Sequence, residues 1–324
     1  MDGGIRTAVG SARVDRAARG VRGFSTCSRM VGRLRTGWRT DRSDGADNAC
    51  ETGAMMSSAP TAISDDVFER WVRHFADNRV AHAEIEARID GNAPAHLPEH
   101  ARQALVRSFQ RFELGEGGDG VHLLRKAGSR GALQQEALRM LVAEEQKHSA
   151  LFRRGLHRLK ASPLSSHWSD RVFTRLRRSL GLRTELALFL TAEAVAMPYF
   201  VVLSRSAPDE VIRGIGTRIA LDEEHHLAFQ IDQLKQQLAS RTLPVRALVF
   251  IAWWCVAVGA ATVVAVDHGP ALRVCGMPVR VYWGAALRSF RRAAAASLSR
   301  DLVAPAGRAS TAGVVEESEG PRHG

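Results

Sequence analysis

The sequence predicts an all-α protein. Apolar residues recur at the three- and four-residue spacing of an amphipathic helix through most of residues 64–238, and breaks that contain Pro or Gly divide this region into segments of helical length. The 324 residues are 45% hydrophobic and 24% charged, a globular composition that suffices for one large domain or two small ones. The four cysteines include no Cys-x-x-Cys pair, which argues against a disulfide framework or a zinc ribbon. We therefore expect a cytoplasmic helical protein.

The two ends of the chain lack the means to form a core. Residues 1–55 are rich in Arg, Gly, Ser and Thr without a sustained apolar period, and they contain no apolar stretch of a secretory signal. Because Met55 and Met56 precede the first credible helix, these residues are interpreted as a disordered extension or a miscalled start, with a transit peptide as the alternative. Residues 301–324 are expected to be a disordered tail. The region between comprises a helical bundle at residues 56–240 and two further helices at residues 241–300.

The formal net charge of +11 raises the question of nucleic-acid binding. Residues 55–239 carry 25 Lys and Arg against 23 acids, so the centre of the chain is almost neutral and the excess lies in the two ends. We therefore expect no nucleic-acid partner for the folded region.

The first two helices are predicted from caps and chain breaks. Ser64 is a suitable N-cap for a helix that runs to about Arg88, with an apolar face of Val67, Trp71, Val72, Phe75, Val80 and Ala83. A second helix is expected to begin near Glu99, and its inner face carries Leu105, Phe109, Phe112, Glu116 and Leu123. Glycines at positions 115, 117, 118 and 120 surround Glu116. They either let a ligand or a neighbouring backbone approach closely, or they end the helix.

The segment 138–159 combines charged residues with an apolar helical face. Its inward positions are Leu138, Leu141, Glu145, His148, Phe152, Gly155 and Leu159. Glu145 and His148 must be paired, hydrogen-bonded or metal-bound, because an uncompensated buried carboxylate is strongly unfavourable. The Glu-x-x-His spacing places both side chains on one helix face, close enough to bind one ion.

Glu193 is isolated in the most apolar helix of the central region. A short helix is expected at about residues 169–180, before Gly181, and the apolar helix follows at residues 183–204. No Arg lies within one turn of Glu193 on this helix, so its compensating charge must come from elsewhere. Pro198 is expected to kink the helix one turn beyond Glu193.

Residues 208–238 repeat the Glu-x-x-His signature. The inner face of this predicted helix carries Ile212, Gly216, Ile219, Glu223, His226, Gln230 and Leu234. Each Glu-x-x-His pair follows a helix with one isolated inner Glu: Glu116 precedes Glu145 by 29 residues, and Glu193 precedes Glu223 by 30. Such near-equal spacing predicts two antiparallel helix hairpins related by pseudo-symmetry.

Over about residues 100–240 this pattern resembles the ligand set of the ferritin-like di-iron and di-manganese carboxylate superfamily. The segments 143–148 (AEEQKH) and 222–226 (DEEHH) are similar to the paired motifs of ribonucleotide reductase small subunits and soluble acyl carrier protein desaturases. The resemblance implies a ferritin-like four-helix bundle with additional flanking helices. It also implies a set of metal ligands: Glu116, Glu145, His148, Glu193, Glu223 and His226, with Glu113 as a substitute for Glu116. By the same resemblance, Asp222 would accept a hydrogen bond from the far nitrogen of His148, and Glu144 one from His226.

The resemblance further implies two bound iron ions, with manganese as the alternative, and a reaction with dioxygen that hydroxylates or desaturates an unidentified apolar substrate. No flavin, haem or iron–sulfur motif is visible in the sequence, so a separate reductase is expected to supply electrons. Two alternatives stay open: metal handling, as in ferroxidase activity, storage or peroxide scavenging, and a bundle whose buried acids are merely paired with Arg.

Two residues argue against particular chemistries of the superfamily. Ile219 stands where para-aminobenzoate N-oxygenases have an additional His. Tyr199 lies six residues past Glu193 and therefore points to a different helix face, which argues against storage of a tyrosyl radical.

The remaining polar and apolar features have simpler readings. Glu224 and His225 lie off the inner face and are expected at the solvated surface. The histidines without paired spacing are expected to be surface or cap residues: His74, His82, His100, His122 and His157.

Residues 247–266 form an uncharged run of 20 residues, for which a membrane anchor, a fifth helix on the bundle and a homodimer interface are the alternatives. Residues 281–298 predict a basic amphipathic helix that lies on a membrane or docks on the bundle.

Overall fold

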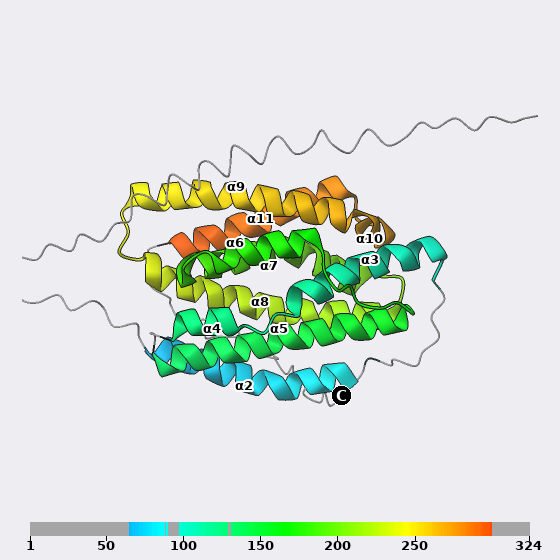
Figure 1. The fold of residues 1–324 in the computed structure, drawn as a ribbon, viewed down its shortest axis with the longest axis horizontal. Helices are drawn as coiled ribbons and strands as arrows, with labels where there is room; N and C mark the ends of the chain where they lie inside the picture. The colour runs from blue at the N-terminus through cyan, green and yellow to red at the C-terminus, as the bar shows by residue number, and fades with distance from the viewer. Residues whose placement is uncertain (1–64, 88, 90–96, 129–130, 300–324) are drawn as a thin grey trace, which may run out of the picture. The chain divides into compact units, whose positions relative to one another are not determined.

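The computed structural model describes residues 65–87, 89, 97–128 and 131–299, which form ten helices and no strand (Figure 1). In chain order the helices are α2 (Asp65–Ala87), α3 (Glu99–Glu116), α4 (Val121–Ala127), α5 (Ala132–Arg158), α6 (Trp168–Arg178), α7 (Leu182–Ser206), α8 (Glu210–Leu238), α9 (Leu243–Asp267), α10 (Gly269–Val274) and α11 (Val279–Leu298). All of them belong to one unit, residues 62–324. The all-α prediction is therefore confirmed for this part of the chain, whereas Ser64 and the predicted disordered segments 1–55 and 301–324 lie outside the described residues.

Four long helices pack together at the centre of this unit. The helices α7 and α8 lie side by side and are joined by only three residues, which requires an antiparallel hairpin. The helix α3 packs on α5, and α5 packs on α8, so the two pairs meet. The helix α2 covers α5 and α8, whereas α11 covers α7 and α8, and α9 lies outside α7 and α11 (Figure 1).

Two glycines allow the paired helices to approach closely. A Cβ at Gly216 of α8 would lie 2.8 Å from the backbone nitrogen of Ser204 and 3.1 Å from the carbonyl carbon of Leu203, both in α7. A Cβ at Gly155 of α5 would collide with the ring of Phe109 in α3. These contacts explain why the predicted inner faces of α5 and α8 each contain a glycine among larger apolar residues.

The helix that begins at Glu99 is shorter than the sequence predicts. It ends at Glu116, and Leu123 lies on the separate helix α4, so the expected continuous apolar face through Leu123 is wrong. Of the two interpretations of the glycine cluster, the structure shows the end of a helix. Gly120 is required in the turn, since its φ is +66° and a Cβ there would collide with Val142 of α5.

Pro198 lies inside α7 and does not end this helix, which continues to Ser206. Its missing N–H removes one backbone hydrogen bond, and the kink expected from this stays a prediction.

Two of the described helices are long and apolar enough to cross a membrane by length and composition alone. One is α7, whose most apolar window is 67% buried, as expected for a helix at the centre of the unit. The other is α9, with a mean hydropathy of 2.3 over a window that is only 17% buried. The apolar run 247–266 thus forms a helix that packs on α7 and α11 by one face and exposes the other.

Candidate metal centre

Both Glu-x-x-His pairs project from α5 and α8 to a common point. One oxygen or nitrogen from each of Glu145, His148, Glu223 and His226 lies within 4.8 Å of the other three. The two histidines and Glu223 are buried, and the Glu145 side chain is 19% exposed. This placement follows from the local pattern, because an i, i+3 spacing puts each pair on the inner face of its helix.

The contacts between the two pairs are crossed. Oε1 of Glu145 lies 2.9 Å from Nδ1 of His226 on the opposite helix, and Oε1 of Glu223 lies 3.6 Å from Nδ1 of His148. Within each helix the corresponding separations are 3.8 Å for Glu145 and His148 and 3.9 Å for Glu223 and His226. Each glutamate therefore reaches both histidines, and each histidine presents Nδ1 to the centre.

The helices α3 and α7 each add one glutamate to this cluster. Glu116, the last residue of α3, is hydrogen-bonded to Glu145 and lies within electrostatic range of Glu193 and Glu223. Glu193 of α7 accepts a hydrogen bond of 2.5 Å from Nε2 of Gln230. Four of the six predicted ligand positions thus meet at one point, and Glu116 and Glu193 interact electrostatically with this group from two further helices.

Glu113, the predicted substitute for Glu116, faces elsewhere. Its Oε1 accepts hydrogen bonds of 2.5 and 3.1 Å from the guanidinium group of Arg153, and Ser149 donates to its backbone carbonyl at 3.3 Å. Glu113 is therefore a compensated buried acid, and Glu116 is the acid of α3 that belongs to the centre.

The protonation of the four central glutamates reflects their crowding. Burial, followed by the negative charge of Glu145, raises the pKa of Glu193 to about 8 and raises the pKa of Glu116 well above its ordinary value. Burial and the charge of Glu193 likewise raise the pKa of Glu223. Burial alone would also raise the pKa of Glu145, but the positive charge of His226, whose Nδ1 lies 2.9 Å away, lowers it to about 2. Without a cation the cluster therefore holds protons that a bound cation would displace.

Two further acids hold the outer nitrogens of the histidines. Nε2 of His148 lies 2.8 Å from Oδ2 of Asp222, and Nε2 of His226 lies 2.9 Å from Oε2 of Glu144. These are the two contacts that the resemblance implied. When Nε2–H donates to a carboxylate, Nδ1 carries the free lone pair, which is the tautomer suited to bind a cation at the centre.

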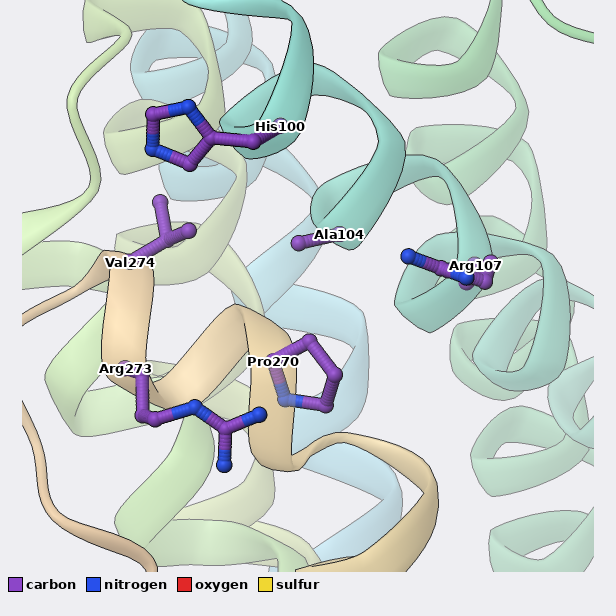
Figure 2. A pocket seen from close by; sticks show the side chains of 6 residues that line it. All are labelled: His100, Ala104, Arg107, Pro270, Arg273 and Val274. Carbon is purple, nitrogen blue, oxygen red and sulfur yellow. The ribbon is translucent and has the colours of Figure 1, made fainter.

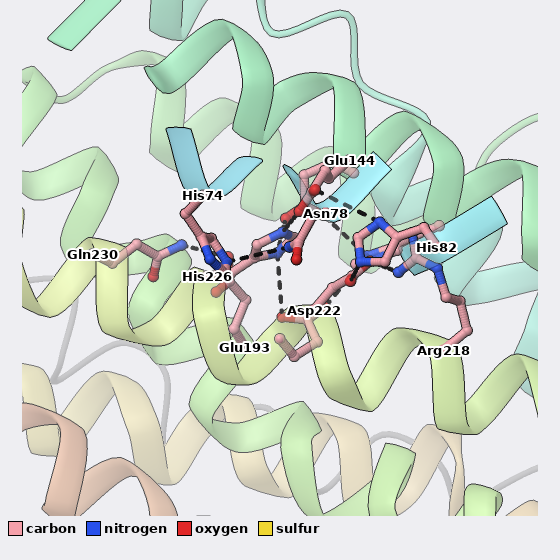
Figure 3. Close-up of polar contacts among 12 residues, drawn as sticks. His74, Asn78, His82, Glu144, Glu193, Arg218, Asp222, His226 and Gln230 are labelled. Carbon is pink, nitrogen blue, oxygen red and sulfur yellow. Dashed lines mark hydrogen bonds and ion pairs between the residues drawn. The ribbon is translucent and has the colours of Figure 1, made fainter. Parts of the chain in front are cut away.

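His82 of α2 lies against both of these outer acids (Figure 3). Its Nε2 is 2.8 Å from Oδ1 of Asp222, and its Nδ1 is 3.8 Å from Oε1 of Glu144. The prediction that His82 is a surface or cap residue is wrong, because it is only 4% exposed. A signal was present in the sequence, since His82 lies seven residues after Phe75 and so extends the buried stripe of α2 by two turns.

Arg218 is a second functional neighbour that sequence reasoning missed. It is fully buried in α8, one turn before Asp222, and it pairs with Asp222 and with Glu86 of α2 at 3.3 Å. Asp222 therefore accepts hydrogen bonds from His148 and Arg218 and lies 2.8 Å from Nε2 of His82, and these contacts outweigh the effect of burial and lower its pKa. The i, i+4 spacing of Arg218 and Asp222 was the available signal.

The other histidines fall into two groups. His100 and His157 are exposed as expected, and so is Glu224. His225 is half-buried, with its ring centroid 4.3 Å from that of His74 in α2, so the expectation of a solvated side chain is wrong for His225.

Most buried acids outside the centre pair with Arg or Lys, whereas Glu144 lies against two histidines and the central glutamates have no Arg or Lys partner among the described residues. Arginine or lysine pairs with Glu113, Glu185, Asp209 and Asp222. Among the described residues no arginine or lysine forms an ion pair with the four central glutamates: Glu116, Glu145, Glu193 and Glu223. The cluster therefore argues against the alternative in which the buried acids of the bundle are merely paired with Arg.

Several buried atoms at the centre have no hydrogen-bond partner in the described structure: Oε1 of Glu145, Nδ1 of His148, Oε2 of Glu193, Oε2 of Glu223 and Nδ1 of His226. Two of them, on Glu145 and His226, approach to 2.9 Å and still lack hydrogen-bond geometry. A buried polar atom without a hydrogen-bond partner lowers the stability of the fold. Polar atoms that surround a shared point without hydrogen-bonding to each other are the arrangement expected of metal ligands. Carboxylate and imidazole donors in this ratio fit divalent transition metals.

In the described residues, fold and site together define an all-helical protein with a buried glutamate and histidine cluster that could hold a metal ion. No family model matches the chain, and neither a curated protein nor a solved structure is significantly similar to it.

Proposed function

We propose that the chain is a ferritin-like di-metal carboxylate protein in which α3, α5, α7 and α8 form the four-helix bundle. Two iron ions, or two manganese ions, would be held by the six residues Glu116, Glu145, His148, Glu193, Glu223 and His226. The observation that carries this proposal is the crossed meeting of the two Glu-x-x-His pairs, with unsatisfied buried atoms that face one another.

Distances favour distinct roles for the six residues. Glu145 and Glu223 each lie near both histidines, so they are suited to bridge two ions, while His148 and His226 each cap one. Glu116 and Glu193 come from the two other helices, α3 and α7, and would be terminal ligands. Asp222 and Glu144 hold the imidazole rings, which orients Nδ1 before any ion binds.

We infer that the reaction oxidises an apolar substrate with dioxygen. Two bound ferrous ions would supply electrons and coordination sites for dioxygen reduction. For hydroxylation the balance is one C–H bond and one dioxygen, with two electrons and two protons, giving one C–OH and one water. A separate reductase must provide the electrons. The fully buried side chains of Phe109, Phe152, Leu190 and Phe200 would exclude water from the neighbourhood of the centre.

Metal handling without an organic substrate is the second candidate. It is favoured because two surface pockets, one on α3 and one where α3 meets α10, include none of the six central residues. Ferrous iron and dioxygen consumed by the purified protein without any hydroxylated or desaturated product, across lipids, aromatics and modified nucleosides, would favour ferroxidase, storage or peroxide scavenging.

Metal analysis of matched glutamate variants tests the proposed centre. The unaltered protein should hold about two iron or manganese ions per chain after anaerobic reconstitution. Glu145→Ala should lose both ions and remain helical by circular dichroism, because it removes a donor that lies near both histidines. Glu113→Ala is the matched control, since Glu113 is also buried one turn from Glu116 and pairs with Arg153, and it should keep its metal.

Two results would contradict this assignment. One is full metal content in the Glu145→Ala protein. The other is metal loss in Glu113→Ala but not in Glu116→Ala, which would move the ligand of α3 to the substitute position.

A further inference from the structure

The outward face of α9 is an exposed apolar surface without a partner in the described structure. Its inner face is a row of small residues, Ala257, Ala261 and Ala265, buried against neighbouring helices. The outer face carries Leu248, which is 61% exposed, Ile251, which is 53% exposed, and Val266, which is 70% exposed, while Leu243 and Val245 are exposed at the start of the helix. Exposed large apolar residues that recur along one helix face are uncommon on a soluble monomer and mark an interaction surface.

The neighbouring helix makes a transmembrane position of α9 unfavourable. Nε1 of Trp283 in α11 donates to Oγ1 of Thr262 in α9 at 3.2 Å, and the rings of Trp254 and Phe290 are 6.0 Å apart. The helix α11 therefore runs alongside α9, and it carries the arginines Arg280, Arg288, Arg291 and Arg292. A bilayer that surrounded α9 would also surround these charges, which is costly. A position parallel to the membrane, with only the outer face inserted, avoids this cost.

The charges around α9 are almost entirely positive. Within residues 242–299 the only acid is Asp267, and it pairs with Arg111 of α3 at 3.3 Å. The exposed arginines of this region have no ion-pair partner among the described residues: Arg273, Arg280, Arg288, Arg291 and Arg292. The apolar strip is thus accompanied by uncompensated positive charge, which favours an anionic partner.

A basic pocket lies where α10, which follows α9, packs on α3 (Figure 2). It has a volume of about 430 Å³ and is lined by His100, Ala104, Arg107, Pro270, Arg273 and Val274. Two arginines and a histidine surround it, and no acid lines it. Guanidinium groups on an apolar floor are suited to bind a phosphate group that is attached to an apolar body.

We propose that the outer face of α9 docks on an anionic phospholipid membrane, with a lipid phosphate bound between Arg107 and Arg273. The helix lies in the interface with Leu248 and Ile251 inserted among the acyl chains, and the arginines of α10 and α11 contact headgroups. A second copy of the chain is a poorer occupant, since a two-fold interface would bring like-charged arginines together. This docking does not depend on metal at the glutamate and histidine cluster.

Sedimentation with vesicles tests the proposal on the full-length protein. Vesicles of phosphatidylcholine and phosphatidylglycerol in equal parts should bind the protein at least about tenfold more strongly than phosphatidylcholine alone, and salt should weaken the binding. The double change Leu248→Gln and Ile251→Gln should lower the partition coefficient at least about tenfold, since two inserted apolar side chains are lost. Arg107→Gln and Arg273→Gln should each lower it about fivefold.

The matched controls are Val80→Gln and Arg79→Gln on α2, which packs on α5 and α8. Val80 is 68% exposed, so it matches Leu248 in exposure, and both controls should bind vesicles as the unaltered protein does. Circular dichroism verifies that each variant is folded.

Three outcomes would overturn the proposal. The first is absence of binding to the anionic vesicles. The second is binding that the α9 and pocket variants leave unchanged, because another segment, such as the Arg-rich residues 1–54, then holds the lipid. The third is a dimer in analytical ultracentrifugation that Leu248→Gln and Ile251→Gln dissociate without any vesicle binding, which assigns the face to a second copy.

Discussion

Asp222 shows how single side chains prepare the centre. It accepts hydrogen bonds from His148, which faces the centre, and from Arg218, which does not, and its Oδ1 lies 2.8 Å from Nε2 of His82. Because these three groups hold its pKa low, Asp222 remains an anion and a fixed acceptor for Nε2 of His148. His82 also lies near Glu144, so it is the one described side chain that touches the acids behind both central histidines. We therefore expect His82 to be a positioning residue.

Substitution of His82 tests this role. His82→Leu should weaken metal binding by up to about tenfold and alter the absorption spectrum of the reconstituted protein, because the ring orientation of His148 is less restrained. His82→Gln keeps a donor for Asp222 and should recover most of the affinity. Competition with a coloured chelator measures both proteins. Equal affinity in the Leu and Gln variants would show that His82 only fills space.

Between elements, backbone contact decides how closely α7 and α8 pack against each other. Gly216 lets α8 lie against the backbone of α7 at Leu203 and Ser204. A larger residue there would meet mainly backbone atoms, which cannot move aside as a flexible side chain could. This approach sets the relative position of Glu193 on α7 and Glu223 on α8. The spacing of the cluster therefore depends on a residue that contributes no ligand.

Two glycine-to-alanine changes should have opposite effects on stability. Gly216→Ala should lower the free energy of unfolding by about 1–3 kcal/mol, since α7 and α8 must separate to admit the new methyl group. Gly259→Ala, inside α9 with nothing within 4 Å of the added carbon, should raise it by up to about 1 kcal/mol. Urea denaturation followed by circular dichroism measures both changes. A stable Gly216→Ala protein would mean that the two helices are not closely packed.

At the scale of the whole molecule, a buried polar cluster ties α9 and α10 to the central helices. His268, between α9 and α10, lies 2.7 Å from the hydroxyl of Ser108 in α3, which is 2.6 Å from the hydroxyl of Tyr199 in α7. Burial, and next the positive charge of Arg111, lower the pKa of His268 to about 3. The folded protein therefore keeps His268 neutral, whereas the unfolded chain protonates it near pH 6.5.

This difference makes stability depend on pH. Between pH 6.5 and about 3 the unfolded state binds one more proton at this residue, so the free energy of unfolding should fall by roughly 1 kcal/mol for each pH unit below 6.5. Urea denaturation of the metal-free protein at pH 7 and pH 5 measures the slope. His268→Asn should show a smaller fall over the same interval, because its side chain does not titrate. The same slope in both proteins would place the titrating group elsewhere.

Much of the candidate centre could be predicted because helical spacing reports which face is buried. Glu145, His148, Glu223 and His226 occupy inner positions of α5 and α8, and their meeting requires only that these faces pack together. The choice between Glu113 and Glu116 could not be made, since both lie on one side of α3 a turn apart. The structure separates them because Arg153 of α5 reaches Glu113.

The sequence by itself determined the helical class, the approximate extent of the long helices, and the four glutamates and two histidines that a buried face cannot hold without compensation. Those properties are local, because propensity, caps and periodicity act over a few turns. Only the tertiary structure decided that His82 and Arg218 stand behind the centre, that α3 stops at Glu116, and that α9 exposes one apolar face beside the arginines of α11. These features depend on contacts between residues far apart in the chain, and no local pattern in a single sequence reveals such contacts.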